Sequence, residues 1–352
     1  MKKRKMILTL IVLLLIPSLF GCSQSASVQE TEKNKTGNIN EQANEAKTDS
    51  FVLKLGHGTS TSSLYHKGSE KFKELVEAKT GGKIKVEIYS DGAIGHDNDL
   101  VNFMKTGNVQ MGMLGVEPLT TIAPKLKVIG MPYIFPDRET AYKVLDGEIG
   151  AEMVAELPQK HGIRVLAYFE NGFRNVTNSK HEILTPEDLK GLKIRTPQSP
   201  VSMAIFKALG ANPVPMSFGE LYTALEQKTV DGQENPLSLI YQNNFHEVQD
   251  YVSLTNHMYS PMVLVISEKV WSEFSPELQK AVQEAAKEAR DYERKLSAEE
   301  EADLIKKLEE AGVKISRPDI SPFIEATKDV HKEFDGEYGA DFYQKVIEAV
   351  KK

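Results

Sequence analysis

The chain has 352 residues, of which 40% are hydrophobic and 26% charged, a globular composition whose length favours two domains. Its formal net charge is -7, and this acidic balance argues against a nucleic-acid partner, which needs a basic footprint. The single cysteine, Cys22, excludes an intramolecular disulfide framework and a metal site with several cysteine ligands.

Residues 1–21 have the features of a secretory signal peptide. A basic start, MKKRK, precedes an apolar run of 15 residues, which is short for a transmembrane helix. The run ends in LFGC, which resembles the lipobox of bacterial lipoproteins, where the cysteine receives a diacylglyceryl group after cleavage. We therefore expect a lipoprotein signal peptide over 1–21 and a lipid anchor on Cys22 that holds the protein at a membrane. The alternative is an ordinary secretory signal with an accidental cysteine.

Residues 22–50 are predicted to form a disordered tether. From residue 23 onward this segment contains no Leu, Met, Phe, Trp or Tyr. It therefore buries too little apolar surface to offset the entropy of ordering. As a flexible coil it would place the folded body about 30 Å from the anchor.

From residue 51 the pattern alternates between strands and helices. Apolar patterning predicts strands at 51–57, 83–89 and 109–114, with helices at 62–82 and 96–108 between them. Helical connections of this length imply parallel pairing with right-handed crossovers. Ligands on such sheets bind beyond the carboxyl ends of the strands.

A strand that ends in an arginine is the most informative element of the middle third. A strand at 163–170 runs into residues 171–180, NGFRNVTNSK, which we interpret as a loop crossing between domains. Thr185 and Pro186 are a good N-cap and first helical residue, so a short helix is predicted next. The strand that follows ends at Arg195, because the prolines after it stop regular structure.

Two further elements follow this strand. Ser217 and Glu220 form a capping box, which predicts a helix that runs to about Lys228. The apolar segment 261–271 is predicted to be a strand that returns to the first domain.

A long helix is predicted near the C-terminus. Ser275 and Pro276 open it, and no Gly or Pro follows before Gly312. As one helix it would be about 54 Å long, so it either spans both domains or kinks. The alternative is a coiled-coil partner helix. The steps of three or four between its apolar residues favour a stripe packed on the body: Leu278, Val282, Ala285, Ala289, Tyr292 and Leu296.

The sequence contains no recognisable enzyme motif: the G-x-S-x-G elbow, the P-loop and H-E-x-x-H are all absent. GAIGHDND, residues 92–99, groups a histidine with acids as a metal site would. We interpret it instead as an exposed helix start, where acids are favoured, and expect neither a metal nor a cofactor. His57 and His66 either line a cleft or, for one or both, lie on the surface.

Polar residues suited to an anion gather at strand ends and in loops of the middle third. Arg174 and Arg195 each offer a planar fork of donors that matches a carboxylate. Asn235 can donate to the same carboxylate or to a hydroxyl, and Phe218 offers an apolar wall. Taken singly, each arginine is better explained by a surface ion pair.

Four stretches carry a family resemblance: GFRNVTNSK, LKGLKIRTPQSP, FKALGANPVPMSFGELYTALEQKTVDGQENP and YSPMVLVIS. In this order they resemble the solute-binding proteins of tripartite ATP-independent periplasmic (TRAP) transporters of the DctP type. The resemblance covers about 51–350. The lipid tether is a departure, because many members of the family are soluble periplasmic proteins.

This resemblance implies an α/β fold of the two-lobed periplasmic-binding-protein (Venus flytrap) type. Hinge strands would join the lobes, and the long helix would contact both. Lobe I would comprise residues 51–171 plus about 260–298, and lobe II residues 172–259 plus about 299–352. Ligand binding between the lobes would favour their closure.

The resemblance also implies the residues of the site. The arginine that pairs with the ligand carboxylate is expected at Arg195, and a second arginine at Arg174. Asn235, Phe218 and Gln198 would complete the ligand-binding set.

The function implied is capture of a small organic acid by a monomer that delivers it to a two-part membrane permease. C4-dicarboxylates are our first expectation; uronic or other sugar acids come next, and 2-oxo or aromatic acids remain alternatives. The residues that select between ligands would lie opposite Arg195, the proposed carboxylate clamp, near His57, Tyr65 and Ile94. The rival functions are an exported α/β enzyme acting on an acidic substrate and a sensory protein that presents its closed form to a receptor.

The lipid anchor gives a first testable prediction. Metabolic labelling with a fatty acid should mark the wild-type protein and spare Cys22→Ala, because the thiol is the site of attachment. Equal labelling of both proteins would refute the anchor.

Overall fold

The computed structural model describes residues 50–352. The predicted signal peptide at 1–21, Cys22 and all but the last residue of the 22–50 tether lie outside the described residues, so those expectations stay predictions. Within the described part, no helix is both long and apolar enough to cross a membrane.

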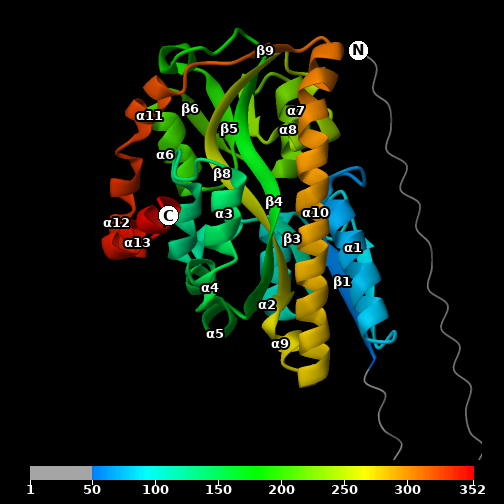
Figure 1. Cartoon of the computed structure of the whole chain (residues 1–352). Helices are drawn as coiled ribbons and strands as arrows, with labels where there is room; N and C mark the ends of the chain where they lie inside the picture. Colours follow the sequence, from blue (N-terminus) through cyan, green and yellow to red (C-terminus); the bar gives the residue numbers. More distant parts are fainter. Residues whose placement is uncertain (1–49) are drawn as a thin grey trace, which may run out of the picture. The chain divides into compact units, whose positions relative to one another are not determined.

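Residues 50–352 build one mixed sheet of nine strands, with helices around it (Figure 1). The strand order is β2-β1-β3-β8-β4-β7-β5-β6, and β9 pairs with β8. The strands are β1 (Phe51–Gly56), β2 (Ile84–Tyr89), β3 (Met111–Gly115), β4 (Ile163–Asn178), β5 (Lys193–Thr196), β6 (Asn212–Pro215), β7 (Gly232–Asn235), β8 (Tyr251–Ser267) and β9 (Lys314–Ser316).

Helices connect most of the strands. The α-helices are α1 (Leu64–Lys79), α2 (Asp97–Thr106), α3 (Arg138–Leu145), α4 (Glu148–Val154), α5 (Leu157–His161), α6 (Pro200–Ala208), α7 (Phe218–Glu226), α8 (Leu237–Gln242), α9 (Glu268–Trp271), α10 (Pro276–Glu310), α11 (Ser321–Thr327), α12 (Asp335–Tyr338) and α13 (Ala340–Val350). The 3-10 helices are η1 (Glu117–Thr121), η2 (Pro124–Gly130), η3 (Pro186–Leu189), η4 (Phe245–Glu247) and η5 (Val330–Glu333).

The two long strands β4 and β8 run antiparallel through the middle of the sheet and join its two halves. We call β1, β2 and β3 with α1 and α2 the first half, and β5, β6 and β7 with α6, α7 and α8 the second half. One end of β8 pairs with β3, and the far end of β4 pairs with β7. Pairing within each half is parallel, which confirms the prediction made for the first half. The antiparallel pairs that link the halves were not predicted.

Two predicted boundaries in the linking strands are wrong. Residues 171–180 are not a loop, because β4 continues to Asn178 with an irregularity between Glu170 and Gly172. Gly172 has φ 122, a conformation that favours glycine, so the strand bends there without ending. The strand predicted at 261–271 begins ten residues earlier, at Tyr251, and ends at Ser267. The last four residues of the predicted range form α9 instead.

The long helix is confirmed as a single element, α10, whose N-cap Ser275 accepts a hydrogen bond from the Leu278 N–H at 3.3 Å. It packs against α1 in the first half and α8 in the second, so it contacts both (Figure 1). Most of the predicted stripe is buried or partly buried. Tyr292 is the exception, because 46% of its surface is exposed and it lies beside Lys71.

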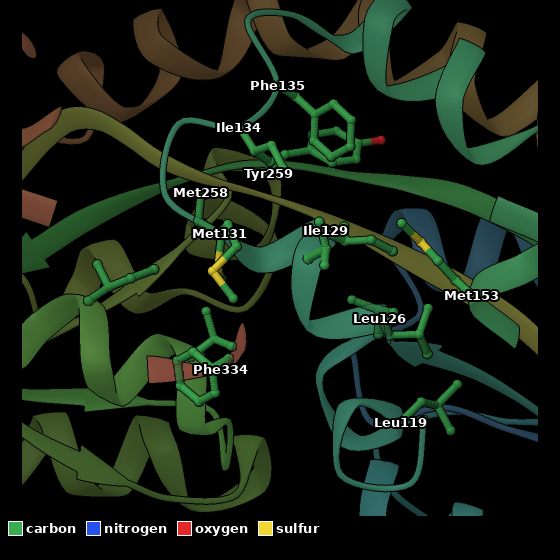
Figure 2. Packing of buried hydrophobic residues seen from close by; sticks show 14 of the residues in the cluster. Leu119, Leu126, Ile129, Met131, Ile134, Phe135, Met153, Met258, Tyr259 and Phe334 are labelled. Atoms are coloured by element: carbon green, nitrogen blue, oxygen red, sulfur yellow. The ribbon is translucent and has the colours of Figure 1, made fainter. Parts of the chain in front are cut away.

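A large apolar core joins η2 to β8 and the C-terminal helices. Ile129, Met131, Met258 and Phe334 all belong to this core, and Figure 2 labels all four. Helices α12 and α13 pack against η2 and α3. The C-terminal helices therefore contact elements that the sequence assigned to the other lobe.

The burial of α10 predicts unequal effects along its stripe. Val282 is fully buried, so Val282→Ala should lower the free energy of unfolding by about 2 kcal/mol through lost contacts and a cavity. The exposed control, Tyr292→Ala, should cost under about 1 kcal/mol. Urea unfolding measures both, and equal costs would contradict this packing of α10.

Candidate functional site

Two adjoining cavities lie between the first and second halves. The outer cavity has a volume of about 320 Å³ and the inner cavity about 50 Å³. The two cavities have several lining residues in common: Asp97, Glu117, Arg195, Pro197 and Phe218. A small organic molecule placed in the outer cavity would therefore contact the residues that separate it from the inner one.

The structure brings all five predicted ligand-binding residues to these cavities. Arg195 and Phe218 line both, and Gln198 lines the outer one. Arg174 and Asn235 line the inner one. Their contact with a ligand stays a prediction.

Neighbouring strands explain why residues far apart in sequence meet here. Strands β5 and β7 are parallel, and the register pairs Arg195 with Gln233. Strand β4 is antiparallel to β7, and its register pairs Asn175 with Asn235, so Arg174 lies beside the end of β7. Asn235 and Arg195 therefore come from the carboxyl ends of β7 and β5, and Arg174 from the part of β4 that lies beside the end of β7.

The start of α7 places Phe218 at the cavity wall. The Ser217 N–H donates to Glu220 Oε2 at 3.3 Å, which is half of the predicted capping box. Helix α7 then runs to Glu226, two residues short of the prediction. The Phe218 ring packs edge-to-face on Phe245, with the ring centroids 5.6 Å apart.

Arg174 is buried and already has an acidic partner. Its Nε and Nη2 donate to the Glu234 carboxylate at 2.5 and 2.9 Å, and Nη2 also donates to Asn235 Oδ1 at 3.0 Å. His257 Nε2 lies 3.2 Å from the same carboxylate. Although burial opposes it, Arg174 holds the pKa of Glu234 below its usual value. The charge of Arg174 is therefore largely compensated within the protein.

Arg195 has a different environment, although it is equally buried. Its Nε and Nη2 both donate to the carbonyl oxygen of Met216, at 3.1 and 2.7 Å. Among the ion pairs of residues 50–352, none includes Arg195. Burial and the nearby charge of Arg174 lower the pKa of Arg195 to about 10. The site thus contains a buried cation whose charge is not matched by an adjacent carboxylate.

Two acids that sequence reasoning missed face this cation. Asp97 and Glu117 line both cavities, and a β-carbon at Gly115 would contact the carboxylates of both. The Asp97 carboxylate accepts a hydrogen bond from the Gly115 N–H at 3.2 Å. Burial and the charge of Glu117 raise the pKa of Asp97 to about 7. Near neutral pH, Asp97 can therefore donate as well as accept hydrogen bonds.

The interpretation of residues 92–99 as an exposed helix start needs correction. Asn98 and Asp99 are exposed, but His96 and Asp97 are half-buried and line the outer cavity. The sequence could have indicated that Asp97 lines the site, because an acid at a helix start that follows a β-strand lies near the carboxyl edge of the sheet. Within residues 50–352, no group of His, Cys, Asp and Glu side chains is arranged to hold a metal ion.

Of the three residues expected to set selectivity, Tyr65, Ile94 and His57, each lies in a different environment. Tyr65 lines the inner cavity. Ile94 packs against the apolar core. His57 is fully buried, and its Nε2 lies 3.0 Å from His66 Nδ1, so the surface interpretation is wrong for His57. Burial lowers the pKa of His57 to about 4, which keeps it neutral at physiological pH.

Comparison with known proteins gives a consistent result. The sequence profile of bacterial extracellular solute-binding proteins, family 7 (DctP), matches residues 55–337. The 2,3-diketo-L-gulonate-binding periplasmic protein YiaO of Escherichia coli is 41% identical over 75% of this chain and 80% of its own length.

Solved structures agree with the profile. The sugar acid binding protein DctPAm of Advenella mimigardefordensis, in complex with galactonate, is 36% identical with a TM-score of 0.82, over 85% of this chain and 97% of that one. A TRAP periplasmic solute binding protein of Sulfurospirillum deleyianum with bound succinate is 34% identical with a TM-score of 0.80, over 84% and 98%. This likeness confirms the two-lobed α/β fold.

The raised pKa of Asp97 predicts a pH-dependent stability. An acid whose folded pKa lies above its unfolded value of 3.8 stabilises the fold when protonated, and this contribution is lost as the pH rises towards 7. Between pH 5 and 7 the ligand-free wild type should therefore lose stability relative to Asp97→Asn, by up to about 1.4 kcal/mol per pH unit. The difference should level off above pH 7.

Urea unfolding of both proteins at several pH values measures this difference. Asp303→Asn, at an exposed acid on α10, is the control and should keep the wild-type profile. Parallel profiles for wild type and Asp97→Asn would contradict the raised pKa.

Proposed function

The chain belongs to the bacterial extracellular solute-binding proteins of family 7, the binding proteins of TRAP transporters, and we propose that it captures a sugar acid through Arg195. Proteins of this family bind small organic acids outside the cytoplasm and are not enzymes. The role implies a membrane permease as partner.

The buried guanidinium of Arg195 is the observation that carries the proposal. A buried cation without an adjacent carboxylate is costly, and a ligand carboxylate would offset that cost. Two N–H groups of Arg195 are held by one carbonyl oxygen, which fixes the plane of the fork before the ligand arrives. The ligand carboxylate would supply the missing charge.

The acids opposite Arg195 favour a hydroxylated ligand. Asp97 and Glu117 accept hydrogen bonds from ligand hydroxyls, and a protonated Asp97 also donates one. A C4-dicarboxylate, our first expectation, would bring a second carboxylate to the same two acids. Arg174 does not offer that carboxylate a free cation, because Glu234 already pairs with it. A monocarboxylate with several hydroxyls therefore matches the charges better.

The other predicted residues have supporting roles in this proposal. Asn235 and Arg174 form the floor of the inner cavity and keep the acid Glu234 away from the ligand carboxylate. Phe218 supplies an apolar wall, and Gln198 lies near the outer end of the ligand.

We also propose that the two lobes close over the ligand. The cavities lie between the first and second halves, which β4, β8 and α10 connect. The lobes would comprise residues 51–171 plus about 260–298, and residues 172–259 plus about 299–352. The contacts of α12 and α13 with η2 and α3 place part of the C-terminal segment against the first of these lobes.

Tethering by a lipid on Cys22 remains part of the proposal. An anchored binding protein would stay near its permease, which raises the effective concentration of one for the other. This idea depends on the sequence of residues 1–50 alone.

The clamp gives a prediction about affinity. Arg195→Ala should weaken binding of the tightest sugar acid by about tenfold or more, because a hydrogen-bonded charge pair contributes roughly 1.5 to 3 kcal/mol. Calorimetric titration of a panel of aldonates and uronates measures this effect. The matched control is Arg164→Ala, which removes an arginine paired with Glu268 outside these cavities. Undiminished affinity in Arg195→Ala would refute the clamp.

The ligand class gives a separate prediction. In the same titrations the wild type should bind a C6 aldonate more tightly than succinate, because succinate presents a carboxylate to Asp97 and Glu117. Asp97→Asn should reduce the difference in affinity between the aldonate and succinate, since it removes one of the two acids. Tighter binding of succinate by the wild type would instead restore the C4-dicarboxylate expectation.

A further inference from the structure

His96 lies in the partition between the outer cavity and a second opening on its far side. That opening, which we call the side groove, has a volume of about 350 Å³ and is lined by Gly58, Gly219 and Tyr222 among others. His96 and Phe218 are the two residues that line both the outer cavity and the side groove. Their side chains therefore separate the proposed ligand space from the side groove.

Three glycines surround the imidazole of His96. A β-carbon at Gly58 would lie 2.9 Å from His96 Nδ1, and a β-carbon at Gly92 or Gly219 would overlap the ring. Real β-carbons do not come this close to other atoms, so the ring occupies space that only glycine leaves free. We call these three residues the glycine seat.

The glycine seat is divided between the two halves of the molecule. Gly58 follows β1 and Gly92 follows β2, so both belong with His96 to the first half. Gly219 is the second residue of α7, in the second half. The contact of His96 with Gly219 therefore exists only while the halves are together.

Packing fixes the position of the ring. His96 Nδ1 is buried, and it has no hydrogen-bond partner among residues 50–352. The backbone N–H of His96 is held at the start of α2 by Asp99 Oδ2, at 3.2 Å. The ring is thus projected from a fixed helix start into the seat.

Two hydrogen bonds cross the same gap beside His96. The Asn98 side chain donates to Gln198 Oε1, and Ser60 Oγ donates to the Gln242 carbonyl oxygen at 3.0 Å. Asn98 and Ser60 lie in the first half, and Gln242 ends α8 in the second. The contact of His96 with Gly219 and these two hydrogen bonds therefore all join the two halves.

We propose that His96 is a latch: its imidazole docks on Gly219 when the lobes close, and this contact holds the ligand-bound form closed. The proposal rests on the proposed capture of a sugar acid by lobe closure. His96 is a positioning residue, because it acts on the equilibrium between open and closed forms rather than on the acid group. Contacts made only in the closed form slow ligand release and so lower the Kd.

A double-mutant cycle tests the latch. Gly219→Ala adds a methyl group that would overlap the His96 ring. It should weaken sugar-acid binding by about tenfold, because the closed form becomes overpacked. His96→Ala should also weaken binding through faster dissociation. In the His96→Ala background, Gly219→Ala should change the Kd by less than about twofold, because its collision partner is gone.

Two measurements separate a latch from a general loss of structure. Thermal unfolding of the ligand-free proteins should be nearly unchanged by Gly219→Ala, since alanine suits a helix and the ring can leave its seat in the open form. Stopped-flow dissociation should show the loss of affinity as faster release. The matched control is Gly336→Ala in α12, where a β-carbon meets no atom within 4 Å, and it should leave binding unchanged.

The outcomes of the cycle are decisive. A large effect of Gly219→Ala in the wild type that disappears in His96→Ala supports the latch. An equal effect in both backgrounds, or no effect in either, overturns it and leaves sugar-acid capture intact.

A spin-label distance distinguishes failure of the latch from failure of the proposed function. Labels at Glu87→Cys and Glu226→Cys, exposed positions in the two halves, report closure in a Cys22→Ala background. Gly219→Ala should shift the distance towards longer values only when His96 is present. The distances are measured with saturating amounts of each acid in an organic-acid panel. If no sugar acid binds but another acid gives closure with this shift, the ligand class is wrong and the latch stands. If an acid closes the wild type and neither substitution changes the distance, the latch is refuted.

Discussion

The candidate site is organised around one buried positive charge, that of Arg195, which no carboxylate of residues 50–352 contacts in an ion pair. Arg174 and Arg195 lie close enough for their charges to interact, yet only Arg174 forms ion pairs within residues 50–352, with Glu234 and, at 3.7 Å, with Glu117. A buried guanidinium that no carboxylate contacts, as at Arg195, favours the arrival of an anion. The neighbouring acids, Asp97 and Glu117, oppose a second anionic group. The cation therefore attracts a carboxylate, and the acids restrict what can be attached to that carboxylate.

The scaffold produces this arrangement by bringing the ends of β5 and β7 beside an inner part of β4. Strands β4, β7 and β5 lie side by side, and each delivers one polar side chain to the edge of the sheet: Arg174, Asn235 and Arg195. The acids are added by η1, which follows β3, and by the start of α2 in the first half. Each half therefore holds part of a charge pattern that is complete only when the halves face one another, and His96 with Gly219 is the steric counterpart of that division.

Much of the fold was predictable from local pattern, and much of the site was predictable from strand ends. Arg195 was placed correctly because a short apolar run followed by prolines marks a strand end. The pairing of Arg174 with Glu234 was not foreseen, because it depends on the antiparallel register of β4 and β7, which joins residues 60 positions apart. The end of β4 was missed because Asn and Gly in NGFRNVTN are typical of loops, whereas Gly172 here permits a bend within a strand. Asp97 was interpreted as part of a solvent-exposed helix start. Its partial burial depends on the second half of the molecule, which covers it and which the local sequence around Asp97 does not reveal.

A crystal structure of the protein with its tightest-binding acid tests the central claim most directly. We expect both carboxylate oxygens within hydrogen-bond distance of the Arg195 guanidinium, and ligand hydroxyls on Asp97 and Glu117. A carboxylate bound elsewhere, with Arg195 still bonded only to the Met216 carbonyl, would contradict this claim.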